Sequence, residues 1–232
     1  MKKLIIAVLF CAMAIITHGQ SSASHSGSKG QREKKMNKRL VAELDSIYYN
    51  DQKYRLVIDS MNRNNQYNSE AIRQLMLLLD PIDSANTKYI VNFLTKYGWP
   101  GPEEIGEKGE NTICIVIQHS TLDVQKKYAP IEKKAVLAHK ADPAWYAILE
   151  DRIAVREGNK QIYGSQLHGN PDPNGQPWVS PLIDPDHVDD RRAGIGLPPM
   201  SEYLKQWNIK WDLEKYKKEL PEIEAKEGGG WK

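Results

Sequence analysis

Acid–base and charged side chains gather at four places in the second half of the chain. At the first, Gln118 and His119 end its most apolar stretch, and Asp123 follows four residues after His119. On a continuing helix, residues four apart share a face, so this carboxylate could fix the imidazole tautomer that a general base needs. The alternative is a histidine that caps a helix C-terminus and is stabilised by the helix dipole.

The second place holds a pair of charged residues, and the third holds amide side chains and a tyrosine. Asp151 and Arg152 are adjacent on a predicted helix, and Arg152 lies on its apolar side, where a guanidinium needs an acidic or carbonyl partner. Gln161, Tyr163 and Gln166 belong to an alternating stretch predicted as a strand. The polar face of this strand could bind a ligand or simply face solvent. The guanidinium of Arg152 could have a functional or a purely structural role.

The fourth place holds the densest charge of the chain. Asp189, Arg191 and Arg192 lie within one short predicted helix. A pair of arginines suits bidentate capture of a carboxylate or phosphate. A solvated helix face with local pairing of Asp189 and Arg192 is the alternative. Together the four places predict a polar cleft in which His119 is a general base oriented by Asp123 or Asp189, and an arginine stabilises negative charge.

No stronger catalytic signature accompanies these groups. The sequence has no glycine-rich phosphate loop, no His-Glu-x-x-His helix, no Gly-x-Ser-x-Gly elbow and no Cys-x-x-Cys pair. Its histidines are widely spaced, so the sequence predicts no metal site, and it leaves the cofactor unknown. The ligand is expected to be small and polar or anionic, such as a peptide or glycan fragment, or another component of the cell envelope.

The elements that position these groups are mostly helical. Apolar residues recur at helical spacing from Leu40, and Asp142-Pro143 is a typical helix start. Glycine, proline, asparagine and aspartate become frequent after residue 158, where two short strands form a predicted hairpin. The fold class expected is mainly α: a single helical domain with a small late β-hairpin, α+β at most. Helices are expected over 40–61, 70–79 (ending before Asp80-Pro81), 89–97, 123–140 (kinked at Pro130), 143–153, 188–193 and 201–207, and strands over 161–167 and 177–183.

The first residues have the pattern of a signal peptide. Lys2 and Lys3 precede an apolar run over 4–16, and cleavage is expected after Gly19. The run is too short for a spanning helix, which needs about 20 apolar residues. Lipidation at Cys11 is the alternative. The protein is therefore expected to be exported, to a periplasm or beyond, with no transmembrane span in the mature chain. Its remaining cysteine, Cys114, is expected to be buried and inert.

Charge divides the rest of the chain. The whole sequence of 232 residues has a formal net charge of +2, which gives no electrostatic reason to expect a nucleic-acid partner. Residues 20–39 hold six basic residues and one acidic residue, and predict a flexible basic arm. The expected organisation is a signal peptide over 1–19, this arm, an α-rich domain over 40–207 and a charged tail over 208–232.

The order of these motifs resembles an uncharacterised bacterial family, a domain of unknown function. The residues that carry the resemblance are Gly98-Trp99-Pro100, Gln118-His119, Asp151-Arg152, Gln161-x-Tyr163-Gly164-x-Gln166 and Val188-Asp189-x-Arg191-Arg192-x-x-x-Gly196-Leu197-Pro198-Pro199. The resemblance implies an exported protein whose polar motifs act as one set. It also implies a helix at 112–119, where β-branched residues alone would favour a strand. Members often have Ala-Asp after Gln-His, whereas this chain has Ser120-Thr121.

Three functions remain open from the sequence. An enzyme requires His119 within hydrogen-bond reach of a carboxylate and open to a concave pocket, and a buried His119 satisfied by backbone groups would exclude it. A binding module requires an open cleft lined by Gln161, Tyr163, Gln166 and an arginine. A structural or interaction protein would use the same motifs as a buried network that fixes the fold.

Overall fold

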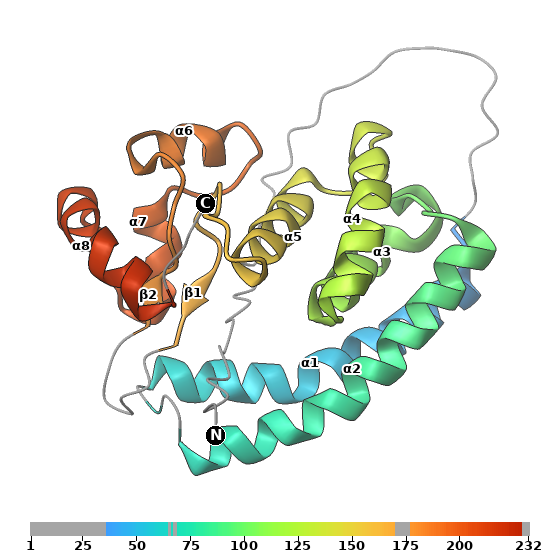
Figure 1. Cartoon of the computed structure of the whole chain (residues 1–232). Coiled ribbons are helices and arrows are strands. Elements are labelled where there is room, and N and C mark those ends of the chain that lie inside the picture. The colour runs from blue at the N-terminus through green and yellow to red at the C-terminus, as the bar shows by residue number, and fades with distance from the viewer. Residues whose placement is uncertain (1–35, 65, 67–68, 170–176, 229–232) are drawn as a thin grey trace.

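The computed structural model describes residues 36–64, 66, 69–169 and 177–228; the expected signal peptide and most of the expected arm lie outside them. Helices dominate the described residues, and two short strands form the only sheet in these ranges (Figure 1), which confirms the mainly α fold class. None of the described helices is long and apolar enough to cross a membrane. The elements are α1 (Lys38–Arg63), α2 (Glu70–Tyr97), α3 (Pro102–His119), α4 (Leu122–Leu137), α5 (Pro143–Arg156), β1 (Leu167–His168), β2 (Trp178–Val179), η1 (Pro185–His187), α6 (Val188–Ala193), α7 (Met200–Tyr203), η2 (Leu204–Trp207) and α8 (Leu213–Lys226).

Two long helices, α1 and α2, lie side by side along one edge of the molecule (Figure 1). The expected end of a helix before Pro81 is wrong, because α2 continues through this proline to Tyr97. Proline removes one backbone hydrogen bond, which costs most where the carbonyl it leaves is buried. Here Pro81 is exposed, as is Leu77 one turn earlier, so water can solvate the freed carbonyl.

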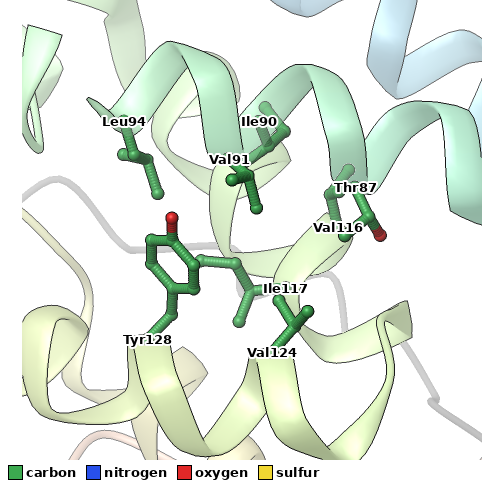
Figure 2. Close-up of a pocket in the computed structure, with 8 residues that line it drawn as sticks. All are labelled: Thr87, Ile90, Val91, Leu94, Val116, Ile117, Val124 and Tyr128. Carbon is green, nitrogen blue, oxygen red and sulfur yellow. The ribbon is translucent and has the colours of Figure 1, made fainter. Parts of the chain in front are cut away.

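The helix α3 is the centre of the first hydrophobic core. It confirms the helix expected at 112–119, and every residue from Ile113 to Ile117 is at most 2 % exposed. The β-branched run forms a helix because α1, α2, α4 and α5 all pack against α3 and bury it on every side. Figure 2 shows side chains of α2 and α4 meeting over Ile117, in an apolar pocket that leaves no space for a water molecule.

The helix α5 begins as the sequence predicts. Asp142 is its N-cap and accepts the backbone N–H of Ala144, and Pro143 is the first helical residue. The preceding helix, α4, contains Pro130. Both helices pack against each other and against α3.

The C-terminal part has a second, separate core. Its hairpin pairs Leu167 with Val179 and His168 with Trp178, and is shorter than the expected strands over 161–167 and 177–183; most of the predicted tip lies outside the described residues. The helix α8 lies in the segment expected as a charged tail, and it packs Tyr216 and Ile223 into this second core.

Candidate functional site

The imidazole of His119 is paired with a carboxylate that was not among the predicted site residues. Its Nδ1 lies 2.9 Å from Oδ2 and 3.1 Å from Oδ1 of Asp51, in the middle of α1. The side chains are 7 % and 1 % exposed, so water barely screens the pair. The expected orientation by Asp123 or Asp189 is corrected here: α1 crosses the end of α3 and brings Asp51 to the ring.

A second ion pair lies beside the first. Both Oδ atoms of Asp83, on α2, accept hydrogen bonds from Nη2 of Arg55, at 2.8 and 2.7 Å. Nη1 of Arg55 donates to the backbone oxygen of Asp51 at 2.8 Å and lies 3.4 Å from its Oδ2. The amide of Gln52 donates to Oδ2 of Asp51 at 2.7 Å. We refer to Asp51, Gln52, Arg55, Asp83 and His119 as the His119 cluster.

The carboxyl groups in and beside the cluster have pKa values that are shifted in different directions. Burial opposes the ionisation of Asp51, but His119, Arg55 and Gln52 outweigh it and hold the pKa of Asp51 below its ordinary value. Burial raises the pKa of Asp83 in spite of Arg55. Burial also raises the pKa of the nearby Asp59 to about 6. Carboxyl groups with separated pKa values in one small region are typical of sites that perform acid–base chemistry.

The same cluster has the composition of a metal site. Asp51, Asp83 and His119 present ligand atoms within 4.8 Å of one another. Two carboxylates and an imidazole suit a divalent transition metal. However, the guanidinium of Arg55 already contacts both carboxylates and supplies the positive charge that a cation would bring. The contacts therefore describe an ion-pair cluster rather than an open cage.

Asp151, one of the predicted residues, belongs to a different group. It is fully buried, and its Oδ1 accepts the backbone N–H groups of Ile162 and Tyr163 at 2.7 and 3.0 Å, while Oδ2 accepts that of Ser165 at 2.9 Å. Gly164, between them, has φ +71° and no room for a Cβ, which would lie 2.8 Å from Sδ of Met200. These bonds explain why the expected strand does not form after residue 161: the N–H groups of Ile162, Tyr163 and Ser165 point to Asp151. Among residues 161–165, Gln161 alone pairs with the other predicted strand, in an isolated parallel bridge to Leu182.

The two glutamines of the hairpin motif complete this group. Nε2 of Gln161 donates to the backbone oxygens of Gln166 and Ser180 at 3.0 and 2.8 Å, and its Oε1 accepts the N–H of Gln166. Nε2 of Gln166 donates to Oγ of Ser165. Both glutamines are fully buried, so they do not line an open cleft as the binding-module hypothesis requires.

The paired arginines donate mainly to backbone oxygens, although Nη1 of Arg191 also lies 3.7 Å from Oδ2 of Asp184. Nε of Arg191 donates to the oxygen of Ile162, and Nη1 and Nε of Arg192 donate to those of Tyr163 and Pro198. Arg192 also lies over the ring of Tyr203, 4.6 Å from its centre. Oδ1 of Asp189 accepts the N–H of Met200. We refer to these residues, with Asp151, Gln161, Tyr163 and Gln166, as the backbone-binding network.

Gln118 and Arg152, the other predicted ligand-binding residues, lie at the helical side of the molecule. Nε2 of Gln118 donates to the backbone oxygen of Trp145 at 3.2 Å, and its own backbone oxygen accepts Nε2 of Gln125. Arg152 is 3 % exposed, and its Nε and Nη2 have no hydrogen-bond partner. Asp123 is exposed in the first turn of α4.

The structure thus separates the predicted residues instead of gathering them in one cleft: His119 belongs to one group and the residues from 161 to 192 to another. Three predicted residues belong to neither group: Gln118, Asp123 and Arg152. A larger cleft of about 820 Å³ lies elsewhere, and none of the predicted site residues lines it. The sequence did contain a signal for Asp51, since it stands seven residues after Leu44 and seven before Ile58, all three buried on α1. A charged residue at a core position of an amphipathic helix indicates a buried partner.

Comparison with known proteins places the chain in a family without a known activity. Residues 39–215 match the model of a family of unknown function, DUF6624. No curated protein and no solved structure matches the chain.

Proposed function

The chain belongs to DUF6624, a family of unknown function, and we propose that it is a hydrolase-type enzyme in which Asp51 orients His119 for proton transfer. The contact between Nδ1 of His119 and Oδ2 of Asp51, at 2.9 Å and with both side chains buried, is the observation that carries this proposal. A carboxylate bound to one ring nitrogen selects the tautomer and supports the charge that forms on the ring.

The tautomer follows from the acidity of Asp51. Its lowered pKa keeps the carboxylate ionised, so it accepts the hydrogen bond and Nδ1 carries the proton. The basic lone pair of the neutral ring is then on Nε2. In hydrolysis this nitrogen takes a proton from water as the water oxygen bonds to the electrophilic atom of the substrate. It then returns the proton to the leaving group as the bond between that group and the electrophilic atom breaks.

The surrounding charges support a ring that changes protonation. When His119 is protonated, its charge and that of Arg55 balance the two carboxylates of Asp51 and Asp83. The cluster is thus stable with an imidazolium at its centre, as general base catalysis requires. Asp51 and Arg55 are positioning residues in this proposal, because they act through His119.

The setting of the enzyme is part of the proposal. The basic residues Lys2 and Lys3, with the apolar run that follows, support export to a periplasm or the exterior. A small polar or anionic molecule of the cell envelope is the substrate class that this setting favours, with no role for nucleic acid or a transmembrane span.

Chromogenic ester, amide and phosphomonoester substrates test the reaction class. Replacing His119 by asparagine should lower turnover at least about a hundredfold, the usual contribution of a general acid–base group. Asp123→Asn is the matched control and should retain turnover, because Asp123 is exposed and does not bind the ring. No turnover by the wild-type chain on the three classes, or turnover that His119→Asn retains, would overturn the proposal.

Nitrogen NMR of the imidazole tests the positioning role without a substrate. In the wild-type protein the proton should be on Nδ1, and Asp51→Asn should lower the pKa of His119. A proton on Nε2, or an unchanged titration in Asp51→Asn, would contradict the assigned role of Asp51.

A structural function is favoured for the other group of motifs. Asp151, Gln161, Arg191 and Arg192 direct their polar atoms to backbone groups. This is the arrangement expected of a buried network that fixes the fold, and it is separate from the His119 cluster.

A further inference from the structure

Arg152 is a buried cation without a counter-charge. Its side chain projects from α5, the residue is 3 % exposed, and neither Nε nor Nη2 has a hydrogen-bond partner. No ion pair joins it to any carboxylate in the part of the chain that the structure describes. An uncompensated buried charge costs several kcal/mol, so proteins normally supply such a group with an anion.

The contacts of α5 show which part of the molecule Arg152 faces. Two turns before it, the backbone oxygen of Trp145 accepts the amide of Gln118. One turn after it, Nη1 of Arg156 donates to the backbone oxygen of Ser120 at 3.0 Å. Residues 145, 152 and 156 share a helix face. This face therefore follows the end of α3, and Arg152 lies between contacts to the two neighbours of His119.

Arg156 adds a second positive charge at the same place. Arg156 is exposed at the surface, but partial burial of its guanidinium, and then the charge of Arg152, lower its pKa to about 10. A guanidinium that is disfavoured by a like charge lies in a positive local potential. The two side chains are four residues apart on one face, a spacing at which both can contact one bound group.

The nearby carboxylates are engaged with other partners. Asp151 faces the other way and accepts backbone N–H groups of residues 162, 163 and 165. Glu157 pairs with Lys126. Asp51 binds His119, Gln52 and Arg55. The positive charge of Arg152 and Arg156 therefore has no compensating side chain among these groups.

We propose that Arg152 and Arg156 bind an oxyanion, a carboxylate, phosphate or sulfate group, at the end of α3 beside His119. A guanidinium offers two parallel N–H donors, which match two oxygens of such a group. This inference extends the proposed function and rests on it, because the proposed function identifies His119 as the group that reacts. It assigns to the substrate an anionic group that is bound next to the bond to be broken.

Thermal unfolding in phosphate, sulfate and acetate, with chloride at matched ionic strength as the reference, tests the site. An oxyanion at a hundred times its Kd should raise the Tm of the full chain by about 5 °C or more. Calorimetric titration with the same three anions gives the Kd and shows which class is preferred.

Two variants distinguish a binding role from a structural role. Arg152→Met removes the charge and keeps the length, so it should abolish the anion-dependent rise in Tm while leaving the anion-free protein as stable as the wild type or more stable. Arg156→Gln should weaken anion binding at least tenfold and leave the fold intact. Arg73→Gln is the matched control, since Arg73 is exposed and pairs with Glu70 on α2.

The result separates this inference from the proposed function. His119→Asn should lose turnover but retain the anion-dependent rise in Tm. Equal stabilisation by chloride and the oxyanions, or a full response in Arg152→Met, would overturn the anion site whatever the activity. A strong loss of Tm in anion-free Arg152→Met would show that Arg152 is structural.

Discussion

Two adjacent residues of α5, Asp151 and Arg152, belong to polar regions that use their charges differently. Asp151 accepts three backbone N–H groups of the loop before β1, and both of its oxygens are engaged. Arg152 faces the end of α3 and has unpartnered nitrogens. Successive helix residues are about 100° apart, so one turn of helix can serve both regions.

The difference distinguishes side chains that bind backbone groups from side chains that pair with one another. In the backbone-binding network, charged and amide side chains satisfy the polar groups of irregular backbone, which otherwise would be costly to bury. In the His119 cluster, side chains bind other side chains, and the proton of an imidazole–carboxylate pair can be exchanged. Loss of a network residue should therefore affect stability, and loss of a cluster residue should affect activity.

The largest effect is expected at Asp151. Replacing it by alanine leaves three backbone N–H groups without an acceptor, which should lower the free energy of unfolding by about 3–5 kcal/mol. Urea denaturation measures this loss. Asp80→Ala, at an exposed position of α2, should change stability by less than about 0.5 kcal/mol. An equal loss of unfolding free energy in Asp151→Ala and Asp80→Ala would contradict a stabilising role for the backbone-binding network.

A smaller effect, and one that depends on pH, is expected at Glu132. This carboxyl is fully buried in the helical core, and burial and then the nearby Glu110 raise its pKa to about 8, although the thiol of Cys114 opposes the shift. The unfolded chain releases this proton near pH 4.5, so the stability is complete below that pH and falls as the pH rises towards 8.

Replacing Glu132 by glutamine should remove the part of this fall that Glu132 causes, while Glu110 and Asp59, whose pKa values burial also raises, should still contribute. At pH 8 the variant should be more stable than the wild type by about 2 kcal/mol, and the two should differ little at pH 4. Denaturation curves across this range give the comparison. The exposed pair of Glu222 with Lys226 offers a control, because Glu222→Gln should leave the slope between pH 5 and 8 unchanged. A wild-type stability that does not fall in this range would contradict the assignment.

The smallest change in stability is expected at Asp83. Asp83→Asn breaks the ion pair with Arg55, in which the Arg55 side chain is 16 % exposed and the Asp83 side chain 18 %. The substitution should lower the free energy of unfolding by about 1 kcal/mol. Thermal unfolding measures this cost. If the cluster serves catalysis, turnover should fall by more than stability alone explains. A variant with wild-type turnover would confine Asp83 to a structural role.

The local elements were well predicted by the sequence because their signals are local. The N-cap at Asp142, the buried helix around Cys114 and the late hairpin follow from capping, from apolar patterning or from the family resemblance. The continuation of α2 through Pro81 was missed because the cost of a proline depends on whether the neighbouring carbonyl reaches water, which the sequence does not state.

The candidate site was predicted only in part, because the sequence signals are local and its residues come from distant segments. Its histidine was identified from the residue type and position, but its carboxylate was assigned to Asp123, the nearest one along the chain, or to Asp189. The partner, Asp51, is 68 residues away and meets His119 because α1 and α2 pack across α3.

The sequence by itself determined most of the helices and the buried stretch around Cys114, and it singled out His119, since periodicity and residue type act over a few residues. Only the tertiary structure decided the pairing of His119 with Asp51 and the different surroundings of Asp151 and Arg152. Hydrogen bonds and ion pairs act over about 3–4 Å. The packing of helices distant in the sequence therefore decides which of the candidate groups come within reach.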